Sequence, residues 1–276
     1  SHLQDQITQF PNILSLKDSP IRIDAQTSST KGYRYTAKPS VRRGARSDQL
    51  AIGLYQPGSH QLVDLRQCWI QSPLINQLLE VLRQEAPHVG IRGYEPGDET
   101  SKHQNESVLR YVVVRQGLNL KTTDDTYDDN DQNVLYLTLI VTTFHQDHIE
   151  RLITRLTRRF SALIGVGVHQ NAMSGNAIFN FSEPTQHVWG AQALSVRVSL
   201  TDQDPDPLYL QISAKSFAQV NPQVAERAYR AMVNGLQPRA GERALDLYCG
   251  VGVIGLMLAE AARRDGGPLE VLWGLE

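Results

Sequence analysis

The chain has 276 residues, of which 41% are hydrophobic and 20% charged, so it is not a disordered or fibrous protein and has room for one large or two ordinary globular domains. The formal net charge of −2 argues against a wholly basic nucleic-acid-binding protein, although cations can still gather locally. No apolar run approaches the roughly 20 residues that span a bilayer, and residues 1–20 lack the basic and apolar regions of a signal peptide. These features indicate a cytoplasmic protein that does not enter a membrane.

Strand signals dominate the middle of the chain. After an N-terminal segment (1–20), a central domain is predicted over 21–212, because short apolar runs bounded by turn residues recur there. Two amphipathic helices interrupt the strands: 72–85, which opens with a Ser-Pro pair suited to a helix start, and 146–160. The central domain is therefore expected to be of α+β class, with strands near residues 33–42, 49–56, 107–115, 134–143, 164–169, 194–200 and 207–213.

From residue 213 onward, helices and strands alternate. A helix over 222–236, a strand over 243–247, a helix over 252–264 and a strand over 269–276 form the β-α-β opening of a doubly wound sheet. Such a sheet normally holds more strands, so 213–276 is expected to be the first half of a Rossmann-like domain, and the chain to be truncated. The predicted fold class is α/β, with the β-rich central α+β domain preceding this incomplete domain.

Basic residues gather between positions 31 and 46, where six Lys and Arg side chains occur with no acid among them and two tyrosines beside them. A polyanion can bind such a stretch, and Arg34, Arg42 and Arg43 are the predicted contacts. An ordinary solvated charged face is the alternative.

Two further charged features have simpler interpretations. Three arginines recur at helical spacing in the second predicted helix, where a solvated face is favoured over phosphate contact: Arg151, Arg155 and Arg158. The acidic run "TTDDTYDDNDQN" (122–133) lies between two apolar β-rich runs and is predicted to be a solvated hairpin loop.

A glycine-rich turn follows the strand at 243–247, with Gly250, Gly252 and Gly255 at G-x-G-x-x-G spacing. Exposed backbone N–H groups and a helix N-terminus at such a turn can hold either a dinucleotide or a methyl donor, and in some proteins the turn serves only close packing. Glu276, at the end of the next strand, can accept adenosine ribose hydroxyls in either case.

The residues before the turn favour S-adenosylmethionine. Asp246 lies where a carboxylate can face the ammonium of a methionine moiety, whereas it would repel a pyrophosphate. Tyr248 can offer an aromatic face to a sulfonium cation. Cys249 has apolar flanks and no neighbouring His, so an inert buried thiol is expected there.

The segments "ISAKSFAQVNPQVAERAYRAMV", "GERALDLYCGVGVIGLMLA" and "VLWGLE" resemble the RNA 5-methyluridine methyltransferase family, which methylates C5 of a uridine in transfer RNA or large-subunit ribosomal RNA. "KGYRYTAKPSVRR", "LVDLRQCWIQSPLINQLLEVL" and "HQNAMSGNAIFNF" are similar to further segments of that family. The resemblance implies that Gln219, Tyr248 and Glu276 contact the methyl donor and that Phe217 lies by the base-binding pocket. Phe217 as a core aromatic, and Gln219 as a simple helix-start residue, are the alternatives.

The chain also departs from the family pattern. The family's nucleophilic cysteine, proton-abstracting carboxylate and Asp-Pro-Pro motif match nothing before Glu276, so no catalytic residue is assigned. Many members bind an iron-sulfur cluster through three upstream cysteines and the one matched by Cys68. No upstream cysteine exists here, and Cys68 alone cannot supply the four thiolates of such a cluster. No metal site is expected. The family's N-terminal RNA-binding barrel is absent, and Ala218 replaces a bulkier residue.

The resemblance implies S-adenosylmethionine-dependent methylation of uridine C5 in tRNA or rRNA, through a cysteine adduct at C6 in the complete enzyme. RNA is the implied partner, with no membrane and no protein partner inferred. Two alternatives stay open: a nicotinamide-dependent oxidoreductase that uses the same glycines, and a non-catalytic RNA-binding fragment.

Overall fold

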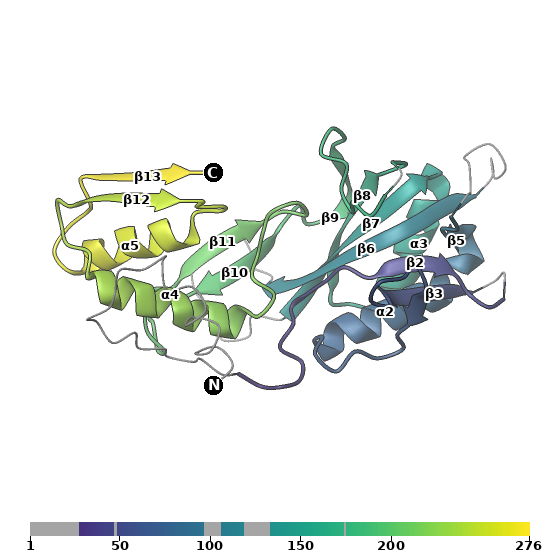
Figure 1. Cartoon of the computed structure of the whole chain (residues 1–276), viewed down its shortest axis with the longest axis horizontal. Coiled ribbons are helices and arrows are strands. Elements are labelled where there is room, and N and C mark those ends of the chain that lie inside the picture. The colour runs from purple at the N-terminus through teal and green to yellow at the C-terminus, as the bar shows by residue number, and fades with distance from the viewer. Residues whose placement is uncertain (1–27, 47–48, 97–105, 119–132, 174) are drawn as a thin grey trace.

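The computed structural model describes residues 28–46, 49–96, 106–118, 133–173 and 175–276, and Figure 1 shows them as a large sheet with helices joined to a smaller β-α-β unit. The predicted N-terminal segment 1–20 lies outside the described residues, as does the acidic run 122–133 apart from Asn133. No helix in the described ranges has the length and apolar character required to cross a membrane.

The central sheet is built around one long strand, β6. Along its main path the strand order is β4-β3-β2-β6-β7-β8-β9, and β1, β5 and β10 also pair with β6, while β11 pairs with β10. The bounds are β1 Thr36–Ala37, β2 Ser40–Arg43, β3 Leu50–Tyr55, β4 Leu62–Asp64, β5 Ile91–Gly93, β6 Ser107–Leu118, β7 Asn133–Thr143, β8 Leu163–Gln170, β9 Thr185–Gly190, β10 Leu194–Val198 and β11 Leu208–Ile212. The antiparallel pairing of β6 with β7 confirms the predicted strands on either side of the acidic run.

Two helices cover one face of this sheet (Figure 1): α2 (Pro73–Glu85) and α3 (Gln146–Arg159). The Ser72 hydroxyl accepts a hydrogen bond from the Leu74 N–H at 3.2 Å, which satisfies one of the free donors of the first turn of α2. A short 3₁₀ turn, η1 (Pro87–Val89), follows α2. The apolar faces of both helices are buried against the sheet through Ile75, Leu78, Leu82, Ile149, Leu152 and Leu156. Both predicted helices are thus confirmed, and α3 connects the parallel strands β7 and β8.

The C-terminal unit contains α4 (Pro222–Leu236), β12 (Arg243–Leu247), α5 (Val253–Arg264) and β13 (Val271–Leu275). β12 and β13 pair in parallel, in register from Arg243 opposite Val271 to Leu247 opposite Leu275. The right-handed β-α-β connection of a parallel sheet requires such a helix between the strands. The predicted alternation after residue 213 is confirmed.

The hairpin β10–β11 joins the two parts of the molecule. Ser195 in β10 pairs with Leu118 at the end of β6, while Val198 packs with Val233 of α4 and Met257 of α5. The connection between the two strands is held by Asp204, whose Oδ1 lies 2.7 Å from Nη1 of Arg264. The hairpin that ends at the predicted domain boundary, residue 212, therefore contacts both the central sheet and the C-terminal unit.

Candidate functional site

The turn after β12 carries backbone conformations that few residues adopt. Tyr248 has a φ of 58°, in the left-handed region, and its side chain is 90% exposed. Gly250 and Gly252 have φ values of 56° and 79°, and Gly252 is the N-cap of α5. A non-glycine residue held in this region is costly and is found most often where a side chain has a function. The conformation projects the Tyr248 ring away from the core.

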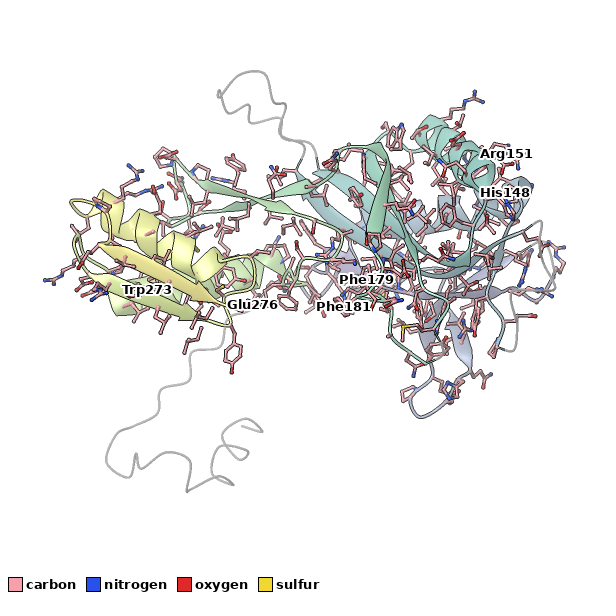
Figure 2. All side chains as sticks on the ribbon, turned by 90° about the horizontal axis from the view of Figure 1, so that it is seen from above. His148, Arg151, Phe179, Phe181, Trp273 and Glu276 are labelled. Carbon is pink, nitrogen blue, oxygen red and sulfur yellow. The ribbon has the colours of Figure 1, made fainter. Side chains whose placement is uncertain are left out.

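A hydrogen bond ties the glycine turn to the end of β13. Glu276 Oε2 accepts from the Gly250 N–H at 2.6 Å, and the Cys249 N–H donates to the Leu275 carbonyl at 3.1 Å. The Glu276 carboxylate thus lies beside the turn, as expected for an acid at the end of the second strand, although it does not line the cavity described below. Figure 2 shows Glu276 at the end of β13, beyond Trp273.

The third glycine has a different role from the other two. A Cβ on Gly255 would lie 3.1 Å from Asp246 Oδ2 and 3.3 Å from a Leu272 methyl group, so this position requires close packing between α5 and the strands. A Cβ on Gly250 would meet nothing within 4 Å, and there the positive φ is what favours glycine. The G-x-G-x-x-G spacing therefore combines two conformational requirements with one packing requirement.

The Asp246 carboxylate makes a contact within the protein that the sequence did not predict. It is buried, and its Oδ2 accepts a hydrogen bond from the Gly255 N–H at 3.0 Å, in the first turn of α5. A carboxylate at this position is stabilised by the free N–H groups and the positive end of the helix dipole. Asp246 does not line the cavity, and its contact with a donor ammonium remains a prediction.

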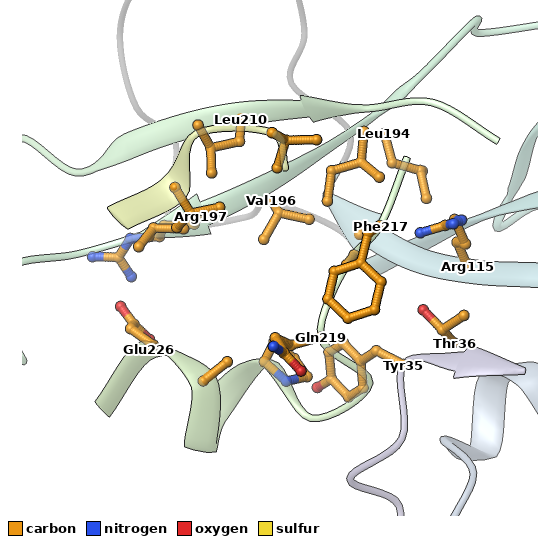
Figure 3. Close-up of a pocket in the computed structure, with 18 of the residues that line it drawn as sticks. Tyr35, Thr36, Arg115, Leu194, Val196, Arg197, Leu210, Phe217, Gln219 and Glu226 are labelled. Carbon is orange, nitrogen blue, oxygen red and sulfur yellow. The ribbon is translucent and has the colours of Figure 1, made fainter. Parts of the chain in front are cut away.

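A cavity of about 310 Å³ lies between the glycine turn, the start of α4, the hairpin β10–β11 and the edge of β6. Four predicted site residues line it: Phe217, Gln219, Tyr248 and Gly250. The remaining six, Asp246, Gly252, Glu276, Arg34, Arg42 and Arg43, do not. Figure 3 shows Phe217 and Gln219 projecting toward the middle of this space, with Leu194 and Val196 above them and Tyr35 beside Gln219.

Phe217 is 69% exposed, so its interpretation as a core aromatic is wrong. The residues that follow Phe217 are held by two hydrogen bonds. Asn221 caps α4 by accepting from the Val224 N–H at 3.2 Å, and the Tyr35 N–H donates to the Val220 carbonyl at 2.8 Å. This second bond brings Tyr35 to the cavity wall, an assignment that sequence reasoning missed because the two segments lie far apart in the chain.

Arg115, in β6, is a further wall residue that the sequence analysis did not select. Its Nη2 donates to the carbonyl oxygens of Ala214, at 3.3 Å, and Ser216. Burial lowers the pKa of Lys38, and the nearby positive charges of Arg115 and Arg34 lower it further. Arg115 is therefore a cation in the cavity wall, and Lys38 and Arg34 lie near it without lining the cavity.

The predicted RNA-contacting arginines of the basic stretch are engaged within the protein. The Arg42 guanidinium lies 4.7 Å from the ring centre of Tyr94 and 5.2 Å from that of Tyr55. Arg43 Nη1 lies 3.4 Å from Glu95 Oε2, so an acid distant in sequence supplies a counter-charge that the stretch itself lacks. Arg34 Nε donates to the Thr36 carbonyl at 3.0 Å. Their contact with RNA remains a prediction.

Two of the three α3 arginines also have acidic partners. Arg151 Nη2 lies 3.1 Å from Asp147 Oδ2, and Arg155 donates to Glu85, which also accepts from Arg159. Burial acts to raise the pKa of Glu85, but the hydrogen bonds from Arg159 and Arg155 outweigh it, and the pKa lies below its ordinary value. This network favours the structural interpretation of the helix face.

The two cysteines lie apart. Cys249 is half-buried at the cavity wall rather than buried, which corrects the expectation of a buried thiol. Cys68 is half-buried beside the start of α2, where its N–H donates to Asn76 Oδ1 at 3.0 Å. Within the described residues, His, Cys, Asp and Glu side chains form no group of three or more able to hold a metal ion.

The relatives found by comparison with known proteins share one description. No protein-family model matches the chain. A protein of Halalkalibacterium halodurans named an uncharacterized RNA methyltransferase is 27% identical over 235 residues, which is 85% of this chain and 45% of that protein. Proteins with the same description in Nostoc sp. and Thermosynechococcus vestitus are each 29% identical, over 87% and 83% of this chain and 46% and 44% of their own lengths. The chain thus spans a little under half the length of these relatives.

One solved structure establishes the fold. The crystal structure of Pyrococcus abyssi tRNA (uracil-54, C5)-methyltransferase in complex with S-adenosyl-L-homocysteine superposes with a TM-score of 0.55 and 16% sequence identity, covering 90% of this chain and 56% of that one. The fold of the described chain, a mixed α/β arrangement with a large sheet, is therefore that of this methyltransferase structure.

Proposed function

We propose that this chain forms the methyl-donor site and the RNA-facing central part of an S-adenosylmethionine-dependent RNA methyltransferase that acts on C5 of a uridine. The observation that carries the proposal is the cavity itself, because it brings Phe217 and Gln219 of one segment to Tyr248 and Gly250 of another. The motifs that resemble the RNA 5-methyluridine methyltransferases imply roles for three of these residues, Phe217, Gln219 and Tyr248, which come from two separate stretches of sequence. The relatives named as RNA methyltransferases support the same class.

The residues present fit the methyl donor. A cavity of about 310 Å³ is within the range of small-molecule sites, and much of its wall is apolar, with Leu194, Val196 and Leu210 along the hairpin. Gln219 offers both a donor and an acceptor, and the exposed Tyr248 ring offers a π face to a sulfonium. The bound donor supplies an electrophilic methyl group, and the protein's part is to hold and orient it in a place shielded from water.

Phe217 suits the substrate side of the same cavity. A uridine must leave its stack before C5 and C6 are accessible, which costs a few kcal/mol. An exposed aromatic ring between the central sheet and the donor residues can stack on the extruded base and offset this cost. In the family that the sequence resembles, a thiolate then adds to C6 of uracil, C5 takes the methyl group, and a base removes the C5 proton as the thiolate leaves C6 and the C5–C6 double bond reforms. We propose the same sequence of steps for the whole protein.

Calorimetric titration of the chain with S-adenosylhomocysteine and with NAD tests the donor assignment. We expect S-adenosylhomocysteine to bind and NAD not to bind, and we expect Tyr248→Ala to weaken S-adenosylhomocysteine by about tenfold, which corresponds to ~1.4 kcal/mol. Phe181→Ala is the matched control, because this aromatic is also highly exposed but lies outside the cavity wall. Binding of NAD alone would instead identify a nicotinamide-dependent oxidoreductase.

A further inference from the structure

Arg115 is a buried cation whose hydrogen-bonding capacity is only partly used. The residue is 5% exposed and lies near the end of β6 that faces the cavity. Its Nη2 donates to the carbonyls of Ala214 and Ser216. Within the part of the chain that the structure describes, nothing accepts a hydrogen bond from its Nε or its Nη1. A guanidinium has five N–H groups and cannot lose its charge at neutral pH, so these donors require an acceptor.

Other buried arginines of this part of the molecule have an acid or aromatic rings beside them, which Arg115 lacks, although the Nε atoms of Arg83 and Arg110 also have no hydrogen-bond acceptor in the described residues. Arg83 Nη1 lies 2.5 Å from Asp64 Oδ1, and Arg92 Nε lies 2.6 Å from Glu106 Oε2. Arg110, also in β6, stacks on the rings of Tyr94 and Tyr111 at 5.1 and 5.4 Å and donates to three backbone carbonyls. A buried charge without an acid is costly unless something else compensates it. Burial also lowers the pKa of Arg115, which reflects that cost.

The surroundings of Arg115 favour an anion. Lys38 and Arg34 add positive charge near Arg115, and Arg34 directly precedes the wall residue Tyr35, although neither of the two lines the cavity. The acid of the wall, Glu226, is already bound to the Ser199 N–H and to Arg230 Nη2, each at 2.8 Å. Figure 3 shows Glu226 at the opposite end of the cavity from Arg115, with Phe217 between them.

We propose that Arg115 binds an RNA phosphate, that of the nucleotide whose base stacks on Phe217. This inference rests on the proposed function and names a phosphate contact within it. The Nη1 atom of Arg115 carries two N–H groups that have no acceptor in the described residues, and a hydrogen bond from a guanidinium to a phosphate oxygen is charge-assisted, which makes it stronger than a neutral one. Figure 3 shows the Phe217 ring beside Arg115, and the nearby charges of Lys38 and Arg34 also favour an anionic nucleotide at this place. Arg115 is thus a substrate-binding residue that is already buried in the chain without RNA.

A carboxylate is the other oxyanion that the proposed site would meet, because the methyl donor carries one on its methionine moiety. The RNA phosphate is favoured because Arg115 belongs to the central sheet, whereas the residues assigned to the donor, Tyr248 and Gly250, form the wall contributed by the glycine turn. The two sources make different predictions, since only a phosphate contact changes the salt dependence of RNA binding.

The test compares Arg115→Gln with the wild-type chain in two titrations, one with a short oligouridylate over a range of salt concentrations and one with S-adenosylhomocysteine. We expect Arg115→Gln to bind the oligouridylate about tenfold more weakly, with the slope of log affinity against log salt reduced by about 0.7, as for one lost phosphate contact on a single strand. Donor affinity should be unchanged. Arg110→Gln is the matched control, because that arginine is equally buried in β6 but does not line the cavity.

Each outcome decides a separate point. An unchanged salt slope in Arg115→Gln overturns the phosphate assignment, and weaker donor binding with unchanged RNA binding assigns Arg115 to the carboxylate instead. A wild-type chain that binds neither probe contradicts the proposed function itself. Should Arg115→Gln fail to fold, the uncharged variant Arg115→Met serves in its place: with oligouridylates in which each phosphate in turn is a neutral methylphosphonate, one position should weaken the wild type but not the methionine variant. If every position weakens both proteins equally, the inference is wrong.

Discussion

At the scale of single residues, Tyr248 has a backbone conformation and a side-chain exposure that do not favour folding. A tyrosine with a φ of 58° at the end of a strand carries backbone strain of order 1 kcal/mol, and its ring is left in solvent. Neither feature contributes to stability. Both are expected if the ring must be presented to a ligand at the turn.

We therefore expect Tyr248→Gly to raise the free energy of unfolding by about 1 kcal/mol while it lowers the affinity for S-adenosylhomocysteine. Gln237 provides a control, because it has a φ of 47° at the end of α4, away from the cavity wall. Gln237→Gly should stabilise similarly and leave donor affinity unchanged. Denaturant unfolding and calorimetry measure the two effects, and a loss of donor affinity in both variants would refute a specific role for the Tyr248 ring.

At the scale of elements, the contact between α5 and the two parallel strands depends on Gly255. The distances of 3.1 and 3.3 Å from its projected Cβ to Asp246 and Leu272 are shorter than ordinary contacts, so a methyl group there requires these side chains to shift by a few tenths of an ångström. The same displacement would disturb the hydrogen bond that holds the Asp246 carboxylate at the start of α5.

Gly255→Ala is accordingly expected to lower the free energy of unfolding by about 1 to 3 kcal/mol. Gly235→Ala, in α4, is the matched control: a Cβ there meets nothing within 4 Å, and alanine is the better helix former by up to about 1 kcal/mol. Opposite signs for the two substitutions in urea denaturation would support the packing argument, and a neutral Gly255→Ala would contradict it.

The ion pairs between α2 and α3 make the stability of the chain depend on pH. Glu85 has a lowered pKa in the folded chain because it is bound by Arg159 and Arg155. The stability that it contributes is therefore fully present above the ordinary pKa of 4.5 and is lost as the pH falls through the lower folded-state value.

We expect Glu85→Gln to destabilise the chain by about 1 to 3 kcal/mol at pH 7, with the difference from wild type shrinking as the pH falls below about 4.5. Glu150→Gln, an exposed position on α3, should change stability little at either pH. Denaturant unfolding at neutral pH and near pH 3 distinguishes the two, and a constant difference at both values would show that Glu85 does not act through its charge.

At the scale of the whole molecule, the sequence predicted the regular elements well because apolar periodicity and helix caps are local signals. Both helices on the sheet, the two of the C-terminal unit and the long strands were all predicted. The short strands β4, β5 and β9 were missed, since three to six residues with mixed polarity carry little periodic signal. What sequence could not provide was the pairing of distant segments, such as Tyr35 with Val220, or the burial of Arg115 within an apolar strand.

The two-stranded sheet of the C-terminal unit leaves large apolar side chains in solvent: Leu245, Leu247, Trp273 and Leu275. A contiguous apolar surface of this kind promotes association between chains. We expect the 276-residue chain to self-associate with rising concentration, and Leu247→Lys with Leu275→Lys to suppress this in sedimentation experiments. The same pair of changes at Leu54 and Val63, exposed on the central sheet, is the control. Equal suppression by both pairs would exclude a specific role for the C-terminal sheet.

The cavity wall combines residues of the central sheet, the hairpin β10–β11, the start of α4 and the glycine turn, so it forms in stages while the chain is synthesised. A growing chain that emerges from its N-terminus can complete the central sheet once β11 has appeared, but the glycine turn follows more than thirty residues later. Domains generally fold in this order as they are made. A nascent chain thus presents the central sheet first and acquires the cavity only afterwards. Under the proposed function, an early contact with RNA is electrostatic and reversible, and base recognition waits for the turn to arrive.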